Sequence, residues 1–365
     1  MELEEEFVQL KCEGFRNLSD QNFRFIQGFN LISGPNGSGK TSVLETLYFL
    51  VYGKSFRSNN SQNIIRKNSD FSRVVGDIHD GYRRVRVGVE RSRSTLTMRV
   101  DGRECQTRIE LALKVPLQVL STETQRILQD GPDGRRKLLN WGCFHNDQGF
   151  SRTWNRYERA LRQRNVALRS KDLRLAFAWE KELAETGALL EVQRSEYLES
   201  YLPIARRYLA EWLGDVDVTI HYRRGWDDDN SLGESLKALR KRDKELGFTS
   251  RGPHRADLSV QALGLQAQHA LSRGQQKLVA IALVLSQLRH LAEQLERRPV
   301  VLLDDLLAEL DDGAVAAVLE DLRQSAATVL FTAINPERLP AWVLQGVRTH
   351  YQLKDGVARE VVSCT

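Results

Sequence analysis

Residues 34–41, Gly-Pro-Asn-Gly-Ser-Gly-Lys-Thr, have the glycine, lysine and threonine spacing of a phosphate-binding loop. Glycines allow successive backbone N–H groups to turn inward around phosphate oxygens. Residues 29–32 before the loop are typical of a short buried strand, and apolar residues recur at helical spacing over 43–51 after it. The segment therefore predicts a strand, a loop and a helix whose N-terminus faces phosphate.

The residue types in the loop indicate how each one would help to hold a nucleoside triphosphate. We expect Lys40 to reach the β- and γ-phosphates and to act as a catalytic residue. Thr41 would offer its hydroxyl group to Mg²⁺. The nucleotide-binding residues predicted from this segment are Gly34, Pro35, Asn36, Gly37, Ser38, Gly39, Lys40 and Thr41.

Residues 300–305, Val-Val-Leu-Leu-Asp-Asp, predict an apolar strand that ends in two carboxylates. A carboxylate in this position holds Mg²⁺ or its water shell beside a phosphate loop, and we assign that role to Asp304. Asp305 is the candidate general base that orients the attacking water. Because many strands end in Asp, the pattern becomes specific only with the Ala-Glu-Leu-Asp that follows at 308–311.

Residues 271–276, Leu-Ser-Arg-Gly-Gln-Gln, resemble the Leu-Ser-Gly-Gly-Gln signature of ABC-type ATPases, with Arg273 in place of one glycine. In that class the signature lies at a helix N-terminus and contacts the γ-phosphate of ATP bound to the other subunit. The resemblance makes Ser272, Gly274 and Gln275 candidate ATP-binding residues and implies ATP and Mg²⁺ as cofactors. It also implies the fold class, an α/β ABC-type ATPase head with a mixed sheet, flanking helices, an antiparallel β subdomain and a helical insert lobe.

About 230 residues separate the phosphate loop from the signature, and residues from about 135 to 213 are rich in Leu, Ala, Glu, Arg and Gln. This composition predicts two or three long helices. About 75 helical residues give an antiparallel pair on the order of 50 Å long, which is too short for the arm of an SMC protein. We therefore predict an ATPase lobe from residues 1–115 and 247–365, and a mainly helical insert lobe from residues 116–246.

Period-two and helical patterns predict further elements. The predicted strands cover residues 83–89, 96–100, 216–220, 300–303 and 328–332. The predicted helices cover residues 232–246, 274–296 and 313–324.

The chain has a net charge of +5, which permits a nucleic-acid partner without requiring one. The positive charge is concentrated between residues 152 and 174, which contain eight Arg or Lys residues and only two acidic residues. A helix over this stretch would present a basic face. DNA contact and an ordinary solvated helix with extended arginines are both consistent with this pattern.

Cellular location is predicted from three features. The four cysteines lie far apart and form neither a disulfide framework nor a zinc motif. The start of the chain, Met-Glu-Leu-Glu-Glu-Glu, is acidic and unlike a secretory signal, and the longest apolar stretch, around 279–288, is too short to cross a bilayer. We therefore expect a cytoplasmic protein without a membrane partner.

Over essentially its whole length, the sequence resembles the RecF family of bacterial recombination mediator ATPases, which is related to SMC proteins. The resemblance rests on the ATPase motifs and on three further segments, 14–18, 131–141 and 252–257. It implies an ATP-dependent homodimer that binds duplex DNA and junctions with single-stranded gaps, and a weak, DNA-stimulated ATPase. It also implies action with RecO and RecR in gap repair, replication restart and SOS induction.

Two alternatives to this function remain open from the sequence. The main one is the nucleotide-binding subunit of a membrane transporter, although such subunits are compact and have a short gap between phosphate loop and signature. The other is a structural SMC-like scaffold without ATP-dependent dissociation.

Several single residues also have two interpretations. Arg16 fits either a γ-phosphate contact or an exposed turn, and His254 fits a turn-capping role better than a site role. No histidine follows the strand at 328–332, so Thr332 or Asn335 is the candidate switch residue. Gln118 and Glu123 are the candidates for the water-positioning residue after the preceding strand.

Overall fold

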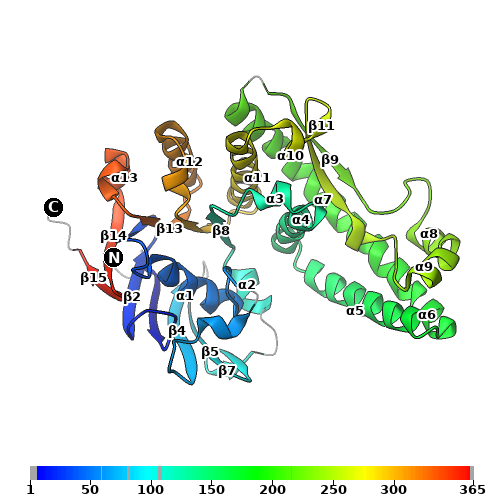
Figure 1. The fold of residues 1–365 in the computed structure, drawn as a ribbon, viewed down its shortest axis with the longest axis horizontal. Helices are drawn as coiled ribbons and strands as arrows, with labels where there is room; N and C mark the ends of the chain where they lie inside the picture. The colour runs from blue at the N-terminus through cyan, green and yellow to red at the C-terminus, as the bar shows by residue number, and fades with distance from the viewer. Residues whose placement is uncertain (1–5, 59, 80–82, 106–108, 215, 362–365) are drawn as a thin grey trace. The chain divides into compact units, whose positions relative to one another are not determined.

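The computed structural model describes residues 6–58, 60–79, 83–105, 109–214 and 216–361 (Figure 1). Cys364 and the first five residues lie outside this part. The chain forms two compact units, which we call the head unit (residues 1–123 and 291–365) and the helical unit (residues 124–290). Residues 247–290 group with the helical unit in this division, whereas the sequence-based limits assign them to the ATPase lobe. The domain limits predicted from the sequence therefore differ from these two units and remain a prediction.

The first sheet of the head unit has six strands in the order β15-β14-β3-β13-β12-β8. Its strands are parallel except for the edge strand β15, which pairs antiparallel with β14. The central strands β3, β12 and β13 are buried along nearly all their length, which explains their continuous apolar sequences. The strands are β3 Phe29–Ser33, β8 Leu117–Ser121, β12 Val300–Asp304, β13 Thr328–Ala333, β14 Val347–Lys354 and β15 Val357–Glu360.

The second sheet of the head unit is antiparallel, in the order β2-β1-β4-β5-β6-β7. Buried and partly exposed residues alternate along β4, so one face of this sheet is in the core. The strands predicted at 83–89 and 96–100 are present as β5 and β6, which pair antiparallel. The strands are β1 Glu6–Glu13, β2 Gln21–Ile26, β4 Phe71–His79, β5 Arg84–Ser92, β6 Leu96–Val100 and β7 Arg103–Glu104.

Helix α1 (Lys40–Tyr52) follows the phosphate loop and contacts strands of both sheets. Most of its side chains are buried, and they join a core that includes Phe23 and Phe25 from β2 and Leu302 from β12. The start of α1 is therefore fixed from several sides. The remaining helices and 3₁₀ turns of this unit are α2 Ile109–Lys114, α12 Asp312–Gln324, α13 Ala341–Gln345, η1 Ser61–Ile64, η3 Leu306–Glu309 and η4 Pro336–Arg338.

The helical unit contains the long helices predicted for residues 135–213, together with a three-stranded sheet in the order β11-β10-β9. Helix α7 has 34 residues, which corresponds to a length of roughly 51 Å. The helices are α3 Arg126–Gln129, α4 Pro132–Asn146, α5 Phe150–Arg169, α6 Leu173–Ala178, α7 Glu180–Leu213, α8 Leu232–Ala238, α9 Arg240–Leu246, α10 Ala267–Ala270 and α11 Arg273–Gln294. The strands and 3₁₀ turn are β9 Val218–Arg223, β10 Asp257–Ala262, β11 Leu265–Gln266 and η2 Pro253–Arg255.

The prediction of one helix over residues 232–246 is wrong, because the chain breaks at Leu239 into α8 and α9. Leu239 has φ −96° and ψ 8°, and the chain turns there before α9 begins. After this break, Asp243 on α9 forms an ion pair with the buried Arg164 on α5.

Candidate nucleotide site

The phosphate loop connects β3 to α1 and contains three glycines with positive φ, namely 148° at Gly34, 78° at Gly37 and 108° at Gly39. A Cβ atom on Gly34 would collide with the carbonyl oxygen of Leu353, and one on Gly39 would lie 2.9 Å from Leu18 Cδ2. Glycine is therefore required at positions 34 and 39 by backbone conformation and by space.

Asn17, in the turn between β1 and β2, braces the loop from outside. Its Nδ2 donates to the carbonyl oxygen of Gly37 at 3.1 Å, and its Oδ1 accepts from Ser42 Oγ on α1 at 2.8 Å. On the other side, the N–H of Gly356 donates to the carbonyl oxygen of Ser38 at 3.0 Å. The sequence indicated residues 14–18 only through family resemblance, and this bracing role was not predicted.

Lys40 is 4% exposed and folds back over the loop, where its Nζ donates to the carbonyl oxygens of Gly34 at 2.9 Å and Pro35 at 3.1 Å. Ser38 Oγ is buried without a hydrogen-bond partner. The first turn of α1 has no side-chain cap. An ammonium group, a buried hydroxyl without a partner and an uncapped helix N-terminus together fit a bound phosphate chain.

Thr41 and Asp304, which the sequence assigned separately to the metal, lie together. Thr41 Oγ1 donates to Asp304 Oδ1 at 2.8 Å, at the carboxyl end of β12. Burial raises the pKa of Asp304 to about 6, while the hydrogen bond from Thr41 opposes the shift and the neighbouring Asp305 adds to it. A hydroxyl beside a carboxylate is the partial ligand set with which proteins hold nucleotide-bound Mg²⁺.

Asp305 adopts a left-handed backbone conformation with φ 52°, which is uncommon for a residue with a side chain. Its N–H donates to Thr332 Oγ1 on β13 at 2.8 Å, and the same hydroxyl lies 3.3 Å from Asp305 Oδ1. Thr332 is 2% exposed. Of the two candidate switch residues, Thr332 contacts Asp305. Asn335 lines a hollow of about 130 Å³ that Asp305 and Thr332 also border.

Arg16 has φ 49° and forms a two-point ion pair with Glu45 on α1, from its Nε to Oε2 at 2.8 Å and from its Nη2 to Oε1 at 2.7 Å. Glu45 is completely buried, and the Ser55 hydroxyl also hydrogen-bonds to it. The guanidinium side chain of Arg16 is only 18% exposed, so it is not a free turn arginine.

Strand β8 pairs with β12 in a register that places Ser121 opposite Asp304. The N–H of Glu123 donates to Ser121 Oγ at 3.3 Å, so Glu123 follows directly at the sheet edge that carries Asp304. Gln118 lies further back, opposite Val301. Of the two candidates for the water-positioning residue, Glu123 is therefore the one at the edge with the carboxylates.

The signature residues lie in the helical unit, at the start of α11. The Ser272 Oγ accepts from the N–H of Gln275 at 3.3 Å, and the Gln275 Oε1 accepts from the N–H of Ser272 at 3.0 Å. This reciprocal capping leaves the hydroxyl proton of Ser272 available to donate. Ser272 and Gly274 are exposed, and a Cβ on Gly274 would meet open space.

Comparison with known proteins decides the family. A family model described as RecF/RecN/SMC N terminal domain matches residues 7–350. A protein of Shewanella pealeana named DNA replication and repair protein RecF is 37% identical over 331 residues, covering 90% of this chain and 92% of the relative. The chain belongs to the RecF family. A relative with the same name from Shewanella amazonensis is also 37% identical, over 338 residues, with 91% and 92% covered.

RecF and SMC structures confirm the predicted ABC-type ATPase head fold. A solved structure of the recombination mediator protein RecF with ATP has a TM-score of 0.86 at 24% identity, with 98% of each chain covered. A second RecF structure, described as RecF-ATPrS, has a TM-score of 0.84 at 25% identity, with 98% of this chain and 99% of that chain covered. An Smc head bound to the C-winged helix domain of ScpA shares the fold at a TM-score of 0.60 and 15% identity, with 97% of each chain covered.

Within the RecF family, the candidate residues of this chain form two groups. Lys40, Thr41, Asp304 and Asp305 lie in the head unit, and the signature serine lies in the helical unit. None of the helices in the described residues combines the length and apolar character that a bilayer-spanning segment requires.

Proposed function

We propose that this RecF-family chain is an ATP-dependent DNA-binding recombination mediator. It would dimerise on ATP, bind duplex DNA and single-strand/double-strand junctions, and act with RecO and RecR in gap repair, replication restart and SOS induction. The contact between Thr41 and Asp304 beside the phosphate loop carries the ATP-dependent part of the proposal. The names of the relatives, DNA replication and repair protein RecF, support the biological part.

In this proposal the phosphate loop binds ATP through its backbone N–H groups and Lys40. Lys40 exchanges its loop carbonyl partners for phosphate oxygens, and the partnerless Ser38 Oγ gains an acceptor or donor. Thr41 and Asp304 would hold Mg²⁺, which neutralises charge on the phosphates during hydrolysis. Asp305, held by Thr332, would accept a proton from the attacking water.

The homodimer would form because the exposed N-terminus of α11 completes the ATP site of a second copy. Ser272 and Gly274 then contact the γ-phosphate held by the partner's loop, with Gln275 keeping the serine in place. Two such contacts related by a two-fold axis make ATP part of the interface, so dimerisation follows ATP concentration. Hydrolysis removes the shared phosphate and releases the pair.

Two substitutions test this arrangement by analytical ultracentrifugation with and without Mg-ATP. Lys40→Arg should weaken hydrolysis and ATP-dependent dimerisation while the monomer stays folded. Ser272→Arg should spare ATP binding by the monomer and abolish dimerisation. A Lys40→Arg protein that dimerises like wild type, or a Ser272→Arg monomer that cannot bind ATP, would overturn the assigned roles.

DNA binding is tested by sedimentation with a short gapped duplex at several salt concentrations. We expect sequence-independent binding that weakens steeply with salt, because contacts to phosphates carry little sequence information. A wild-type protein that ignores the duplex in saturating Mg-ATP would refute the proposed function. The comparisons above give no support to the alternative of a transporter subunit.

A further inference from the structure

Helix α5 carries most of the basic stretch that the sequence singled out, with six arginines and one glutamate among its 20 residues. The six arginines do not share one environment. Arg164 is completely buried. The other five are exposed, namely Arg152, Arg156, Arg159, Arg162 and Arg169.

The five exposed arginines lie on one side of α5. At about 100° of rotation per residue, their positions fall within a sector of about 140° around the helix axis. From Arg152 to Arg169 the row is about 25 Å long, because each residue adds roughly 1.5 Å. This length corresponds to roughly seven base pairs along a DNA duplex at about 3.4 Å per pair.

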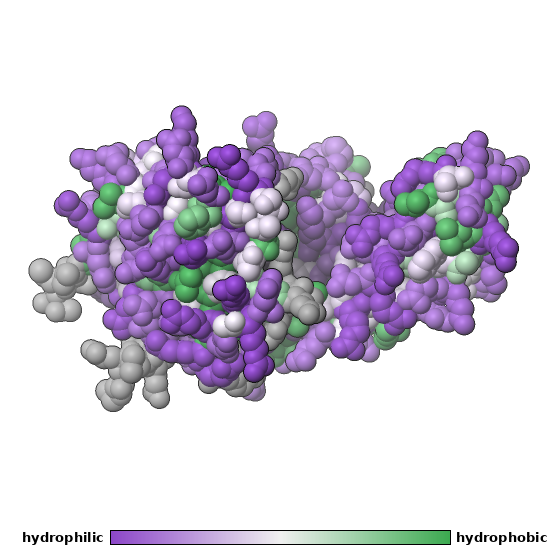
Figure 2. All heavy atoms as spheres, turned by 90° about the horizontal axis from the view of Figure 1, so that it is seen from below, coloured by the Kyte–Doolittle hydropathy of each residue, from purple (hydrophilic) through white to green (hydrophobic). Residues whose placement is uncertain are grey.

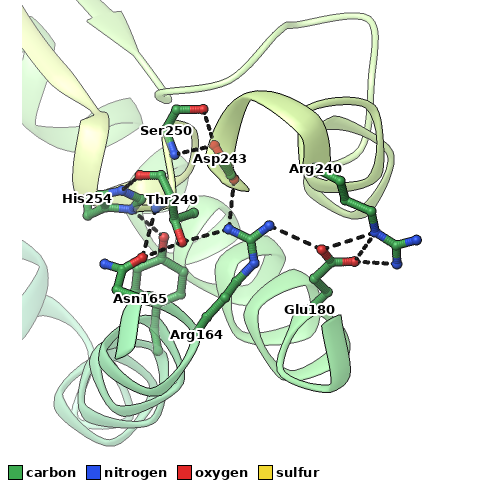
Figure 3. Close-up of polar contacts among 9 residues, drawn as sticks. Arg164, Asn165, Glu180, Arg240, Asp243, Thr249, Ser250 and His254 are labelled. Carbon is green, nitrogen blue, oxygen red and sulfur yellow. Dashed lines mark hydrogen bonds and ion pairs between the residues drawn. The ribbon is translucent and has the colours of Figure 1, made fainter. Parts of the chain in front are cut away.

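The buried arginine fixes the direction of this row. Arg164 donates to Asp243 on α9 at 2.7 Å and to Glu180 on α7 at 3.1 Å (Figure 3). It also donates to Thr249 Oγ1 at 2.8 Å. Arg240 on α9 binds the second oxygen of the same Glu180 at 2.7 Å. These contacts join α5, α7 and α9 on their inner sides and keep the exposed arginines of α5 turned outward.

His254 secures the same region without adding charge. Its Nδ1 lies 2.6 Å from the hydroxyl of Tyr157 on α5, and its Nε2 lies 3.0 Å from the carbonyl oxygen of Thr249. Burial lowers the pKa of His254 to about 4, so the ring is neutral at pH 7. This contact agrees with the structural role that the sequence favoured for His254.

Few acidic groups oppose the arginine row. Glu182 on α7 pairs with Arg156 at 2.9 Å, and Glu158 on α5 is partly exposed. Asp172 uses its carboxylate to cap α6 through the N–H of Leu175. Helix α9 packs on the buried side of α5 through Asp243 and Arg164, and its exposed residues are also mainly basic, with Lys241, Arg242 and Lys244 beside Glu245.

We propose that the outward face of α5 (Arg152, Arg156, Arg159, Arg162 and Arg169) binds the phosphate backbone of duplex DNA. The proposal rests on the proposed function and assigns its DNA contact to this face. Guanidinium groups match phosphate in geometry and charge. Val166 is the one large apolar side chain that α5 exposes, whereas a protein-binding helix presents an apolar stripe. Figure 2 views the molecule from the side on which α5 lies in Figure 1, and the helical unit is largely hydrophilic there.

The test compares two double variants of the full-length protein. Arg159→Ala with Arg162→Ala removes two arginines of the proposed face. Arg206→Ala with Arg207→Ala removes two exposed arginines of α7 and is the matched control. Binding of a fluorescent 30-base-pair duplex is measured in Mg-ATP from 50 to 300 mM salt, and ATP-dependent dimerisation is measured in parallel.

We expect the α5 variant to lose roughly tenfold or more in DNA affinity, with a salt dependence lower by about 1.8 in log–log slope for two lost phosphate contacts. Its ATP-dependent dimerisation should stay unchanged, and Arg159→Lys with Arg162→Lys should retain the salt dependence. An α5 variant that binds DNA as wild type does, or a control that loses as much, would overturn the assignment. Because the comparison requires DNA binding by the wild type, failure of the proposed function is seen separately, in the wild-type protein itself.

Discussion

Replacing Asp304 with Asn should stabilise the head unit while abolishing hydrolysis. Burial raises the pKa of the Asp304 carboxyl from 3.8 to about 6. A carboxyl with a raised pKa in the folded state favours folding when protonated, so this contribution is present below about pH 4 and is lost as pH rises through about 6. A shift of about two pKa units corresponds to at most about 3 kcal/mol of unfolding free energy at pH 7.5.

The Asp304→Asn substitution removes the charge and keeps an oxygen that can accept the hydrogen bond from Thr41. The difference in unfolding free energy between the variant and wild type should therefore be close to zero near pH 4 and grow to its full value above pH 6. Hydrogen exchange of peptides from α1 and β12, measured in EDTA, reports the opening free energy of the head unit alone.

In Mg-ATP the wild type should become more stable than Asp304→Asn. Mg-ATP binds and stabilises the folded wild type, whereas the variant lacks the carboxylate for the metal. Asp305→Asn is the matched control, since it removes the neighbouring carboxylate and leaves the hydrogen bond between Thr41 and Asp304 in place. A difference between Asp304→Asn and wild type that is independent of pH, or a variant that is less stable at pH 7.5 in EDTA, would refute the argument from burial.

Three further substitutions have defined outcomes. Thr332→Val removes the acceptor for the N–H of Asp305 and should slow ATP turnover while leaving ATP affinity unchanged. Thr332→Ser keeps the hydroxyl and should retain activity. Equal loss of turnover in both variants would argue against a role for the hydroxyl. Gly34→Ala should prevent ATP binding, as measured by nucleotide fluorescence, because a side chain at φ 148° would collide with β14. Arg164→Met leaves Asp243 buried without its partner and should lower the unfolding free energy of the helical unit by about 3–5 kcal/mol in urea; a change below about 1 kcal/mol would contradict the network.

The predictable part of the nucleotide site is local in sequence. The phosphate loop needs particular glycines because its own backbone turns through positive φ at Gly34 and Gly39. The meeting of Thr41 with Asp304 follows from the sheet, since β3 and β12 are parallel to their shared neighbour β13 and so end at the same edge. The motif alone assigned Asp304 to the loop, and the parallel strand order of the structure accounts for the contact between Asp304 and Thr41.

The contacts that hold these residues in place could not be predicted in the same way. The residue types around Asp305 do not predict its left-handed conformation. Its partner Thr332 is 27 residues away on another strand. The ion pair between Arg16 and Glu45 likewise depends on how a turn folds over a helix. Such contacts are set by tertiary packing, and nothing in the local sequence pattern encodes them.

Arg164 is a different case, because a signal for its burial was present. Tyr157, Ala160, Arg164 and Leu168 recur three or four residues apart and lie on the inner face of α5, where all four are buried. Counting charges along the helix ignored this periodicity and gave Arg164 the same weight as its exposed neighbours. Assigning each arginine to a helical face would have separated the buried one from the five exposed ones.

This separation changes what a basic helix implies. A buried arginine with two carboxylate partners contributes nothing to the surface potential, and its partners are withdrawn from the surface as well. Glu180 also pairs with Arg240 on α9, so the charges of the two arginines and the two carboxylates in this network cancel. The positive surface of α5 therefore comes from its five exposed arginines, and these arginines are the physical basis for phosphate binding.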